Sequence, residues 1–263
     1  MNARTQRILA PLVSAVVFLA IWYGVRASMP ESKQFMLPYP HAVAQAFVEN
    51  GAKLARASLN IAFGALIGFT SAIVVAFGLA VFMSLSGFIR ASLYPHLMAA
   101  QMMPVIALAP ILVIWVGPGL PSVSIITFLI CFFPLVVNTT QGLISTDQKL
   151  VELFQLYRAT RWQEILRLRI PAAMPYFFTG LRISGILASI GAIVGDFSAG
   201  SSANNGAGLG FLVLIYGARL QMAELFATVI SGCIVGFVFV LVVNRLSWHY
   251  LHQWHDSYER TDR

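Results

Sequence analysis

The sequence carries little charge for its length. Only 10% of its 263 residues are Asp, Glu, Lys or Arg, whereas 58% are hydrophobic and the mean hydropathy is +0.78. Soluble domains carry about 25% charged residues, so this composition excludes an ordinary soluble domain and predicts an integral membrane protein. Because no polar linker or Ser/Pro-rich boundary divides the chain, we expect a single transmembrane domain over residues 1–263.

Cysteine is scarce too, and the sequence lacks common catalytic motifs. Cys131 and Cys233 both lie within apolar segments and no CxxC is present, so we expect two buried thiols rather than a disulfide framework. There is no G-x-x-x-x-G-K-[ST] phosphate loop, no H-E-x-x-H, and no paired-carboxylate or Ser/His/Asp arrangement. We therefore expect a protein that is not an enzyme and that binds no cofactor itself.

Three histidines near the C-terminus are candidate metal ligands. His249, His252 and His255 follow one another at steps of three. On a helix, steps of three and six carry the last ring away from the face of the first, and no cysteine or acid set completes a tetrahedral site. The tryptophans and tyrosines around them are typical of an interfacial aromatic belt. We expect no metal site.

Acidic residues are fewer than basic ones. The chain has 17 Lys and Arg against 10 Asp and Glu, for a formal charge of +7. The basic residues form no continuous stripe with interleaved aromatics, which argues against nucleic-acid binding. They fall between apolar segments, as orientation charges do in membrane proteins. With the N-terminus inside, eleven lie on the cytoplasmic side and five on the outer side, so we expect both termini and the segment 145–175 in the cytoplasm.

Long hydrophobic runs dominate what is present. A helix needs about 20 mostly apolar residues to cross a bilayer. The N-terminal run is long for a signal peptide and no small-residue cleavage site follows it, so we interpret it as a retained first span. The six predicted spans cover residues 8–25, 59–83, 97–115, 122–143, 175–194 and 225–243. Prolines and glycines within them serve either close packing or a flexible pathway.

The connections differ in character. The segment 37–40 (LPYP) predicts the start of a short outer helix reaching about residue 48, because prolines are tolerated in a first helical turn. The segment 198–210 is small and polar and predicts a flexible loop or re-entrant turn. Asp196 lies just past the fifth span, either as a functional acid at membrane depth or as an interfacial acid that reaches water.

The longest polar insertion spans residues 145–175. Its first half has apolar residues at the i, i+3, i+4, i+7 spacing of an amphipathic helix. Capping-box pairs mark two helix starts, and the second helix is expected over 161–169, ending near Pro171. The pattern fits either a hairpin that rests on lipid or a docking surface for a cytoplasmic protein. The apolar positions are Leu150, Leu153, Phe154 and Tyr157, and the capping pairs are Ser145 with Gln148 and Thr160 with Gln163.

The insertion also contains a spaced pattern. Glu152 is followed six residues later by Arg158, then by the segments 170–175 (IPAAMP) and 180–182 (GLR). This pattern is similar to the cytoplasmic loop of ABC importer permeases, where Glu-Ala-Ala precedes a Gly and then a hydrophobic residue with Pro. The branch that includes nitrate, alkanesulfonate, taurine and thiamine-precursor permeases is matched over nearly the whole chain. The further matching segments are 37–40 (LPYP), 94–95 (YP), 101–110 (QMMPVIALAP), 115–119 (WVGPG), 132–134 (FFP) and 208–210 (GLG).

Two departures from this family pattern stand out. Leu153 and Phe154 replace two alanines, and Arg158 replaces the loop glycine. A glycine there permits the left-handed backbone that sets the angle between two loop helices. Arginine therefore predicts either helical backbone at this position or a turn shifted to Ala159 and Thr160.

The resemblance implies an all-α bacterial inner-membrane protein with six transmembrane helices of the type I importer permease fold. Its partners would be an ATPase subunit that binds the ATP, a periplasmic or lipid-anchored substrate-binding protein, a second permease copy, and membrane lipid. A coupling helix at about 151–159 would dock on the ATPase. The residues implied are Glu152, Phe154, Tyr157, Arg158 and Arg161 for docking, and Met102, Met103, Pro104, Pro110 and Asp196 for the translocation path.

The solute is small and polar or anionic in this interpretation. The segment 101–110 with Trp115 looks closest to permeases for thiamine pyrimidine precursors or riboflavin, and sulfonate, taurine or nitrate come next. The alternative is a membrane-embedded enzyme, or a membrane scaffold that recruits a soluble partner. Co-purification with an ATPase distinguishes these alternatives.

Overall fold

The computed structural model describes residues 3–200 and 207–251. Within these ranges the chain forms helices and connecting turns, with no β-strand. His252 and His255 lie outside the described residues. The elements are α1 (Ala3–Ser28), the 3₁₀ turn η1 (Glu31–Met36), α2 (Pro40–Glu49), α3 (Gly51–Ser84), α4 (Gly87–Gln101), α5 (Val105–Val116), α6 (Leu120–Ile144), α7 (Gln148–Leu156), α8 (Arg161–Glu164), the π-helical turn η2 (Ile165–Arg169), α9 (Ile170–Ala199), α10 (Leu209–Ala218) and α11 (Met222–Leu251).

Four continuous helices in the described ranges are long and apolar enough to cross a membrane. They are α3, α6, α9 with its α8–η2 extension, and α11, and they contain the predicted spans 59–83, 122–143, 175–194 and 225–243. The predicted span 8–25 falls in α1, whose apolar part Leu12–Ser28 is a shorter helix. The prediction of an all-helical membrane protein is confirmed, with four or five spans among the described residues.

The predicted span 97–115 is not one straight helix. It falls on α4 and α5, which are bent by 94° at a short break. Pro104 is the N-cap of α5, with ψ 97°. Proline lacks the amide hydrogen that would continue the ladder, and it disfavours helical backbone at the preceding residue, so α4 ends before Met103. The sequence signalled a breaker here but not the size of the bend.

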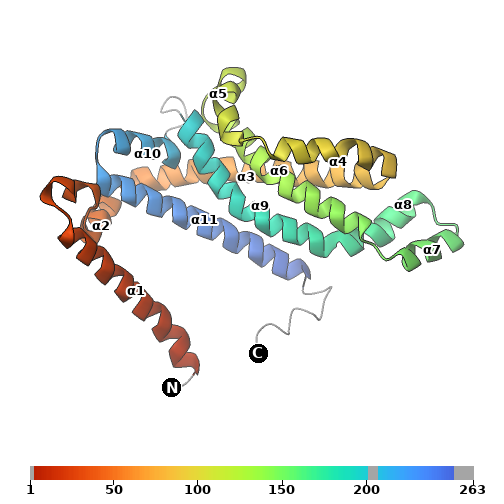
Figure 1. The fold of residues 1–263 in the computed structure, drawn as a ribbon, viewed down its shortest axis with the longest axis horizontal. Coiled ribbons are helices and arrows are strands. Elements are labelled where there is room, and N and C mark those ends of the chain that lie inside the picture. The colour runs from red at the N-terminus through yellow and green to blue at the C-terminus, as the bar shows by residue number, and fades with distance from the viewer. Residues whose placement is uncertain (1–2, 201–206, 252–263) are drawn as a thin grey trace.

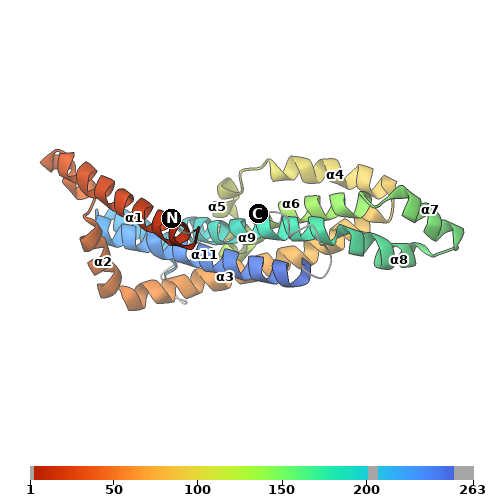
Figure 2. The same ribbon diagram turned by 90° about the horizontal axis from the view of Figure 1, so that it is seen from below.

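Helix α6 lies between α3 and α9, and these helices run side by side along the bundle (Figure 1, Figure 2). Their approach depends on small residues: a Cβ built on Gly68 would stand 2.5 Å from the Ser124 carbonyl oxygen, and one on Gly142 would stand 2.7 Å from the Tyr176 Cβ. Small residues let transmembrane backbones approach closely. This geometry favours the packing interpretation of the glycines over the flexible-pathway one.

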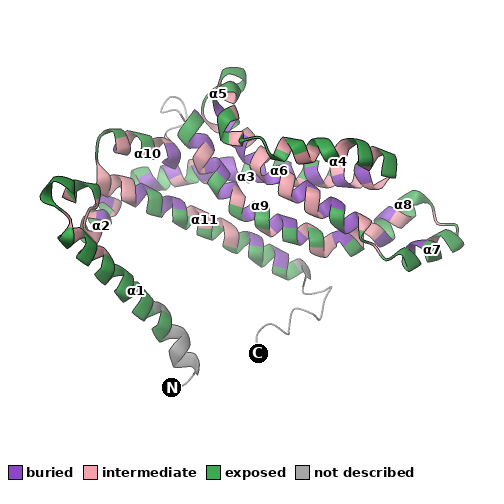
Figure 3. Ribbon diagram, viewed as in Figure 1, coloured by how far each residue is buried: buried purple, intermediate pink, exposed green. Residues whose placement is uncertain are grey.

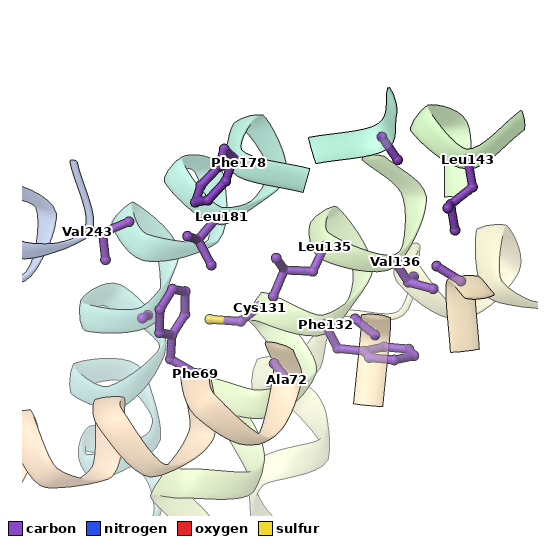
Figure 4. Packing of buried hydrophobic residues seen from close by; sticks show 14 of the residues in the cluster. Phe69, Ala72, Cys131, Phe132, Leu135, Val136, Leu143, Phe178, Leu181 and Val243 are labelled. Atoms are coloured by element: carbon purple, nitrogen blue, oxygen red, sulfur yellow. The ribbon is translucent and has the colours of Figure 1, made fainter. Parts of the chain in front are cut away.

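The buried core is centred on the same three helices. Phe69, Cys131, Leu135 and Leu181 belong to one cluster of buried residues, in which Cys131 is fully buried (Figure 4). The Cys131 thiol donates to the Ser184 carbonyl oxygen (3.3 Å), and the Ser184 hydroxyl donates to the Cys131 carbonyl oxygen (2.8 Å). These two hydrogen bonds join α6 to α9 and give each of the two buried side chains a partner.

The outer faces of the bundle are apolar and exposed. In α1, Val16 and Phe18 are 65% and 61% exposed, and much of the surface of α11 is also exposed (Figure 3). Cys233 of α11 is exposed, so the prediction that it is buried is wrong for the isolated chain. It lines an open apolar hollow between α9, α10 and α11, where lipid or another chain would cover it. Faces of this kind fit a bilayer as solvent.

The two ends of the bundle carry different connections (Figure 1). One end holds α2 and α10, and the other holds α7 and α8. The predicted short helix at the first end is confirmed as α2, with Pro40 in its first turn. At the second end, the polar insertion leaves α6 and returns through α9.

Candidate functional site

The polar insertion folds as a helical elbow, defined here as residues 147–169. Asp147 caps α7, and its carboxylate accepts the Lys149 amide hydrogen (2.9 Å). The predicted capping box at Ser145 is wrong, because α6 extends to Ile144 and the Ser145 hydroxyl instead donates to the Gln141 carbonyl oxygen (2.7 Å).

The second predicted capping box is confirmed and starts α8. The Thr160 amide donates to the Gln163 side-chain oxygen (2.8 Å), and the Gln163 amide donates to the Thr160 hydroxyl oxygen (3.3 Å). Without these bonds the two backbone amides, which lie at the start of the helix, would lack a hydrogen-bond acceptor. The elbow therefore consists of α7, a short turn, α8 and η2. The prediction that the second helix ends near Pro171 is wrong, because helix continues from Arg161 to Ala199.

Arg158 forms that turn with left-handed backbone. Its φ is 53°, so neither predicted alternative, helical backbone or a turn shifted to Ala159 and Thr160, is correct. The Ala159 amide donates to the Phe154 carbonyl oxygen (3.0 Å), and the Arg158 amide donates to the Gln155 carbonyl oxygen (2.9 Å). These two bonds make a Schellman cap, whose left-handed position usually holds glycine. The backbone keeps the conformation that glycine would favour, although the residue is arginine.

The elbow presents a mixed apolar and charged surface. Leu156 and Tyr157 are 81% and 80% exposed, and Glu152 and Arg158 are exposed beside them. Phe154 is half-buried by its own chain. Three exposed apolar residues of the elbow, Leu156, Trp162 and Leu166, were not predicted from the sequence. Leu156 could have been, because it continues the i, i+3, i+6 spacing that starts at Leu150. The exposed apolar side chains of the elbow are Leu150, Leu153, Leu156, Tyr157, Trp162 and Leu166.

Two arginines of the elbow reach back to the bundle. The Arg161 Nη1 donates to the Leu85 carbonyl oxygen at the end of α3 (2.7 Å). The Arg169 Nε donates to the Glu164 carboxylate (2.6 Å), and its Nη1 donates to the Leu143 carbonyl oxygen in the last turn of α6 (3.2 Å). A polar hollow of about 250 Å³ lies between these groups. Whether Arg161 also contacts an ATPase stays a prediction.

Asp196 lies inside α9 rather than past its end. Its side chain is buried (6% exposed) and accepts the Phe211 amide hydrogen at the start of α10 (2.8 Å). A Cβ on Gly208 would overlap this carboxylate, so a glycine is required there by close approach. The carboxylate thus caps α10, a helix that the predicted loop 198–210 did not include, and residues 201–206 of that loop lie outside the described residues. The sequence signal that could have predicted this cap is Asp196 with Gly208 and Gly210, the glycines 12 and 14 residues later.

The other path candidates lie on the bent pair. Met102 and Met103 are 79% and 50% exposed at the break between α4 and α5, and Pro104 and Pro110 are exposed in α5. The structure does not bring these side chains against Asp196 within one chain. The Gly119 amide donates to the Ala199 carbonyl oxygen (2.7 Å), which joins the α5–α6 turn to the end of α9. The role of the two methionines and two prolines in a translocation path stays a prediction.

The fold and the elbow define a class: a polytopic, all-helical membrane protein with one exposed polar elbow between two spans. Residues 57–250 match the family model described as "Binding-protein-dependent transport system inner membrane component". That match covers well over half of the chain, and the chain belongs to this family.

Three curated relatives are similar over most of their length. A probable ABC transporter permease protein of Haemophilus influenzae is 35% identical over 85% of this chain and 89% of its own. A formylaminopyrimidine transport permease protein of Halalkalibacterium halodurans is 36% identical over 78% and 80%. A riboflavin transport system permease protein of Chloroflexus aurantiacus is 31% identical over 76% and 74%.

The resemblance to ABC importer permeases is therefore confirmed, and the chain is a multi-pass protein of a bacterial inner membrane. Its relatives are transport permeases, which are not enzymes, so that prediction is confirmed by family membership. Permeases of this kind work with an ATPase and a substrate-binding protein.

Proposed function

We propose that this chain forms the translocation path of an ATP-driven importer and that a separate ATPase docks on the elbow. The exposed apolar side chains of the elbow carry this proposal, with Leu156 and Tyr157 each about four-fifths exposed. A contiguous apolar surface on a polar segment marks a protein contact. In this mechanism the ATPase displaces the elbow, and nucleotide and loaded binding protein shift the permease between inward-facing and outward-facing states.

Glu152 is the docking residue whose charge tests this proposal. We expect the wild-type chain to co-purify with an ATPase and the Glu152→Lys variant to lose that partner and its uptake while still inserting in the membrane. Glu49→Lys is the matched control, because Glu49 has the same charge and is also exposed, but lies in α2 at the other end. Normal uptake by Glu152→Lys would contradict docking at α7, and an elbow that binds only lipid vesicles would favour the interfacial interpretation.

The topology proposed has six crossings in a single domain over residues 1–263, with both termini cytoplasmic. The four long helices supply four crossings, and α1 and the bent α4–α5 pair supply the other two. A membrane-impermeant maleimide applied to intact cells tests the orientation, using exposed positions at opposite ends of the bundle. Leu156→Cys should be protected and Glu49→Cys should be labelled, and the reverse pattern would overturn the orientation.

We propose a homodimer in which the two copies enclose the path. The exposed side chains of Met102 (79%) and Met103 (50%) at the α4–α5 break support a surface that a second copy covers. In the dimer, Met102, Met103, Pro104, Pro110 and Asp196 are the candidate path residues. Crosslinking of a Met102→Cys variant between copies in native membranes tests both the dimer and the placement of the α4–α5 break, and a monomer under all conditions would contradict the proposal.

The solute proposed is a thiamine pyrimidine precursor or riboflavin, with sulfonate, taurine or nitrate as the next candidates. Two relatives named for formylaminopyrimidine and riboflavin transport support the first pair. ATP binding belongs to the partner subunit, because the sequence lacks a phosphate loop. Uptake of labelled formylaminopyrimidine and of riboflavin, each in competition with taurine and nitrate, distinguishes the candidates.

A further inference from the structure

Besides the short backbone link that leads into it from α6, the elbow is attached to the bundle at three places. Its backbone continues through α8 and η2 into α9. Arg161 reaches the Leu85 carbonyl oxygen at the end of α3 (2.7 Å), and Arg169 reaches the Leu143 carbonyl oxygen at the end of α6 (3.2 Å). The ends of α3 and α6 and the start of α9 therefore all meet the elbow.

These side-chain contacts have a clear physical basis. The last carbonyl groups of a helix have no partner within the helix and carry partial negative charge. Hydrogen bonds from a guanidinium to such an acceptor are charge-assisted and shorter than neutral ones. The Arg169 guanidinium is further held by Glu164, and their side chains are only 21% and 14% exposed, so solvent weakens this pair less than a surface ion pair.

The backbone attachment is the irregular one. In η2 the Ile170 amide donates to the Ile165 carbonyl oxygen, five residues back. Pro171, one residue later, has no amide hydrogen and disfavours the regular helix ahead of it. Single π turns of this kind mark functional sites. A polar hollow of about 250 Å³ lies beside η2, whereas Ile165 and Leu168 of η2 are themselves buried.

We propose that Arg161 and Arg169 are positioning residues that latch the elbow to the ends of α3 and α6, so that elbow and core move as one body. This latch rests on the proposed function, because the motion that it would transfer to the core is the motion that the ATPase drives. Arg161 then acts on the bundle side of the elbow, whereas Glu152 and Tyr157 face the docking partner.

Paired spin labels measure this attachment directly. Labels at Lys149 and Phe88, which are both exposed and lie outside the docking residues, report the elbow and the first turn of α4 after α3. A Cys233→Ser background removes the exposed native thiol, and the buried Cys131 stays. In the full chain in nanodiscs, we expect a narrow distance distribution that ATP does not shift when the ATPase is bound. Arg161→Ala should broaden it and let ATP shift it.

Conservative replacements separate the latch from a general structural role. Arg161→Lys should restore the narrow distribution, because one donor suffices for one carbonyl oxygen. For Arg169, labels at Leu166 and Gln141 measure the distance between the elbow and the end of α6. Arg169→Lys should restore a narrow distribution of this distance only in part, because a forked guanidinium spans two acceptors and a single ammonium does so poorly. Arg167→Ala is the control, since this exposed arginine makes no hydrogen bond or ion pair to the described residues.

The outcomes are distinct. An unchanged Lys149–Phe88 distribution in Arg161→Ala overturns the latch. Loss of the ATPase in Arg161→Ala also overturns it and assigns Arg161 to the docking contact. If the wild-type chain binds no ATPase, the proposed function fails, while the comparison of wild type with Arg161→Ala in the isolated chain still decides the latch.

Discussion

Replacing Arg158 by glycine should stabilise the elbow. Arg158 has φ 53° at the left-handed position of a Schellman cap. Left-handed backbone costs a residue with a Cβ about 1–2 kcal/mol, and this cost disappears with glycine. The greater freedom of glycine in the unfolded chain offsets about 0.5–1 kcal/mol. The net expectation is a gain of about 0–1.5 kcal/mol.

Unfolding of the purified chain in mixed detergent, titrated with denaturing detergent, measures this difference. Arg158→Lys keeps both the charge and the backbone strain, so its stability should equal that of wild type. Leu220→Gly is a second test, because Leu220 has φ 57° in an equivalent cap at the end of α10. Leu153→Gly, inside the regular helix α7, should destabilise by about 1 kcal/mol. A destabilised Arg158→Gly variant would refute the backbone argument, whereas weaker ATPase binding alongside a gain in stability would fit both the cap and the docking role.

Four further substitutions, one of them a control, test the packing of the core and of the buried carboxylate. Gly68→Ala should destabilise by about 1–3 kcal/mol, because its Cβ would stand 2.5 Å from the Ser124 carbonyl oxygen; Gly78→Ala on the same helix, with open space around it, should instead stabilise by up to about 1 kcal/mol. Asp196→Ala should cost about 1–3 kcal/mol in the same unfolding titration, since the Phe211 amide loses its acceptor, and an unchanged midpoint would show that the cap contributes nothing. Gly208→Ala should destabilise through the same site, because its Cβ would overlap the Asp196 carboxylate; equal stability would mean that the start of α10 shifts freely.

Local signals predicted the elements whose partners lie nearby in the chain. The start of α8 follows from Thr160 and Gln163, which are three residues apart and bond each other. The start of α2 follows from Pro40, whose fixed φ suits a first helical turn. The long helices follow from apolar length, because only satisfied backbone survives in lipid.

The candidate site was predicted only in part, because its decisive contacts join distant residues. Arg161 was predicted as a docking residue, but its partner Leu85 is 76 residues away and nothing in the pattern pairs them. Asp196 was placed beside a loop, yet it caps a helix that begins thirteen residues later. The conformation of Arg158 was predicted wrongly, since residue type argued against left-handed backbone and the closing hydrogen bonds of the cap outweighed it.

The sequence by itself determined that this chain is a helical membrane protein and where its polar elbow begins. Composition, apolar run length and short-range capping are local properties, so they can be read along the chain. Only the tertiary structure decided the 94° bend at Pro104, the burial of Asp196 against α10, and the attachment of the elbow to α3 and α6. Those features depend on which helix ends meet in space, and that is set by the packing of small residues between α3, α6 and α9.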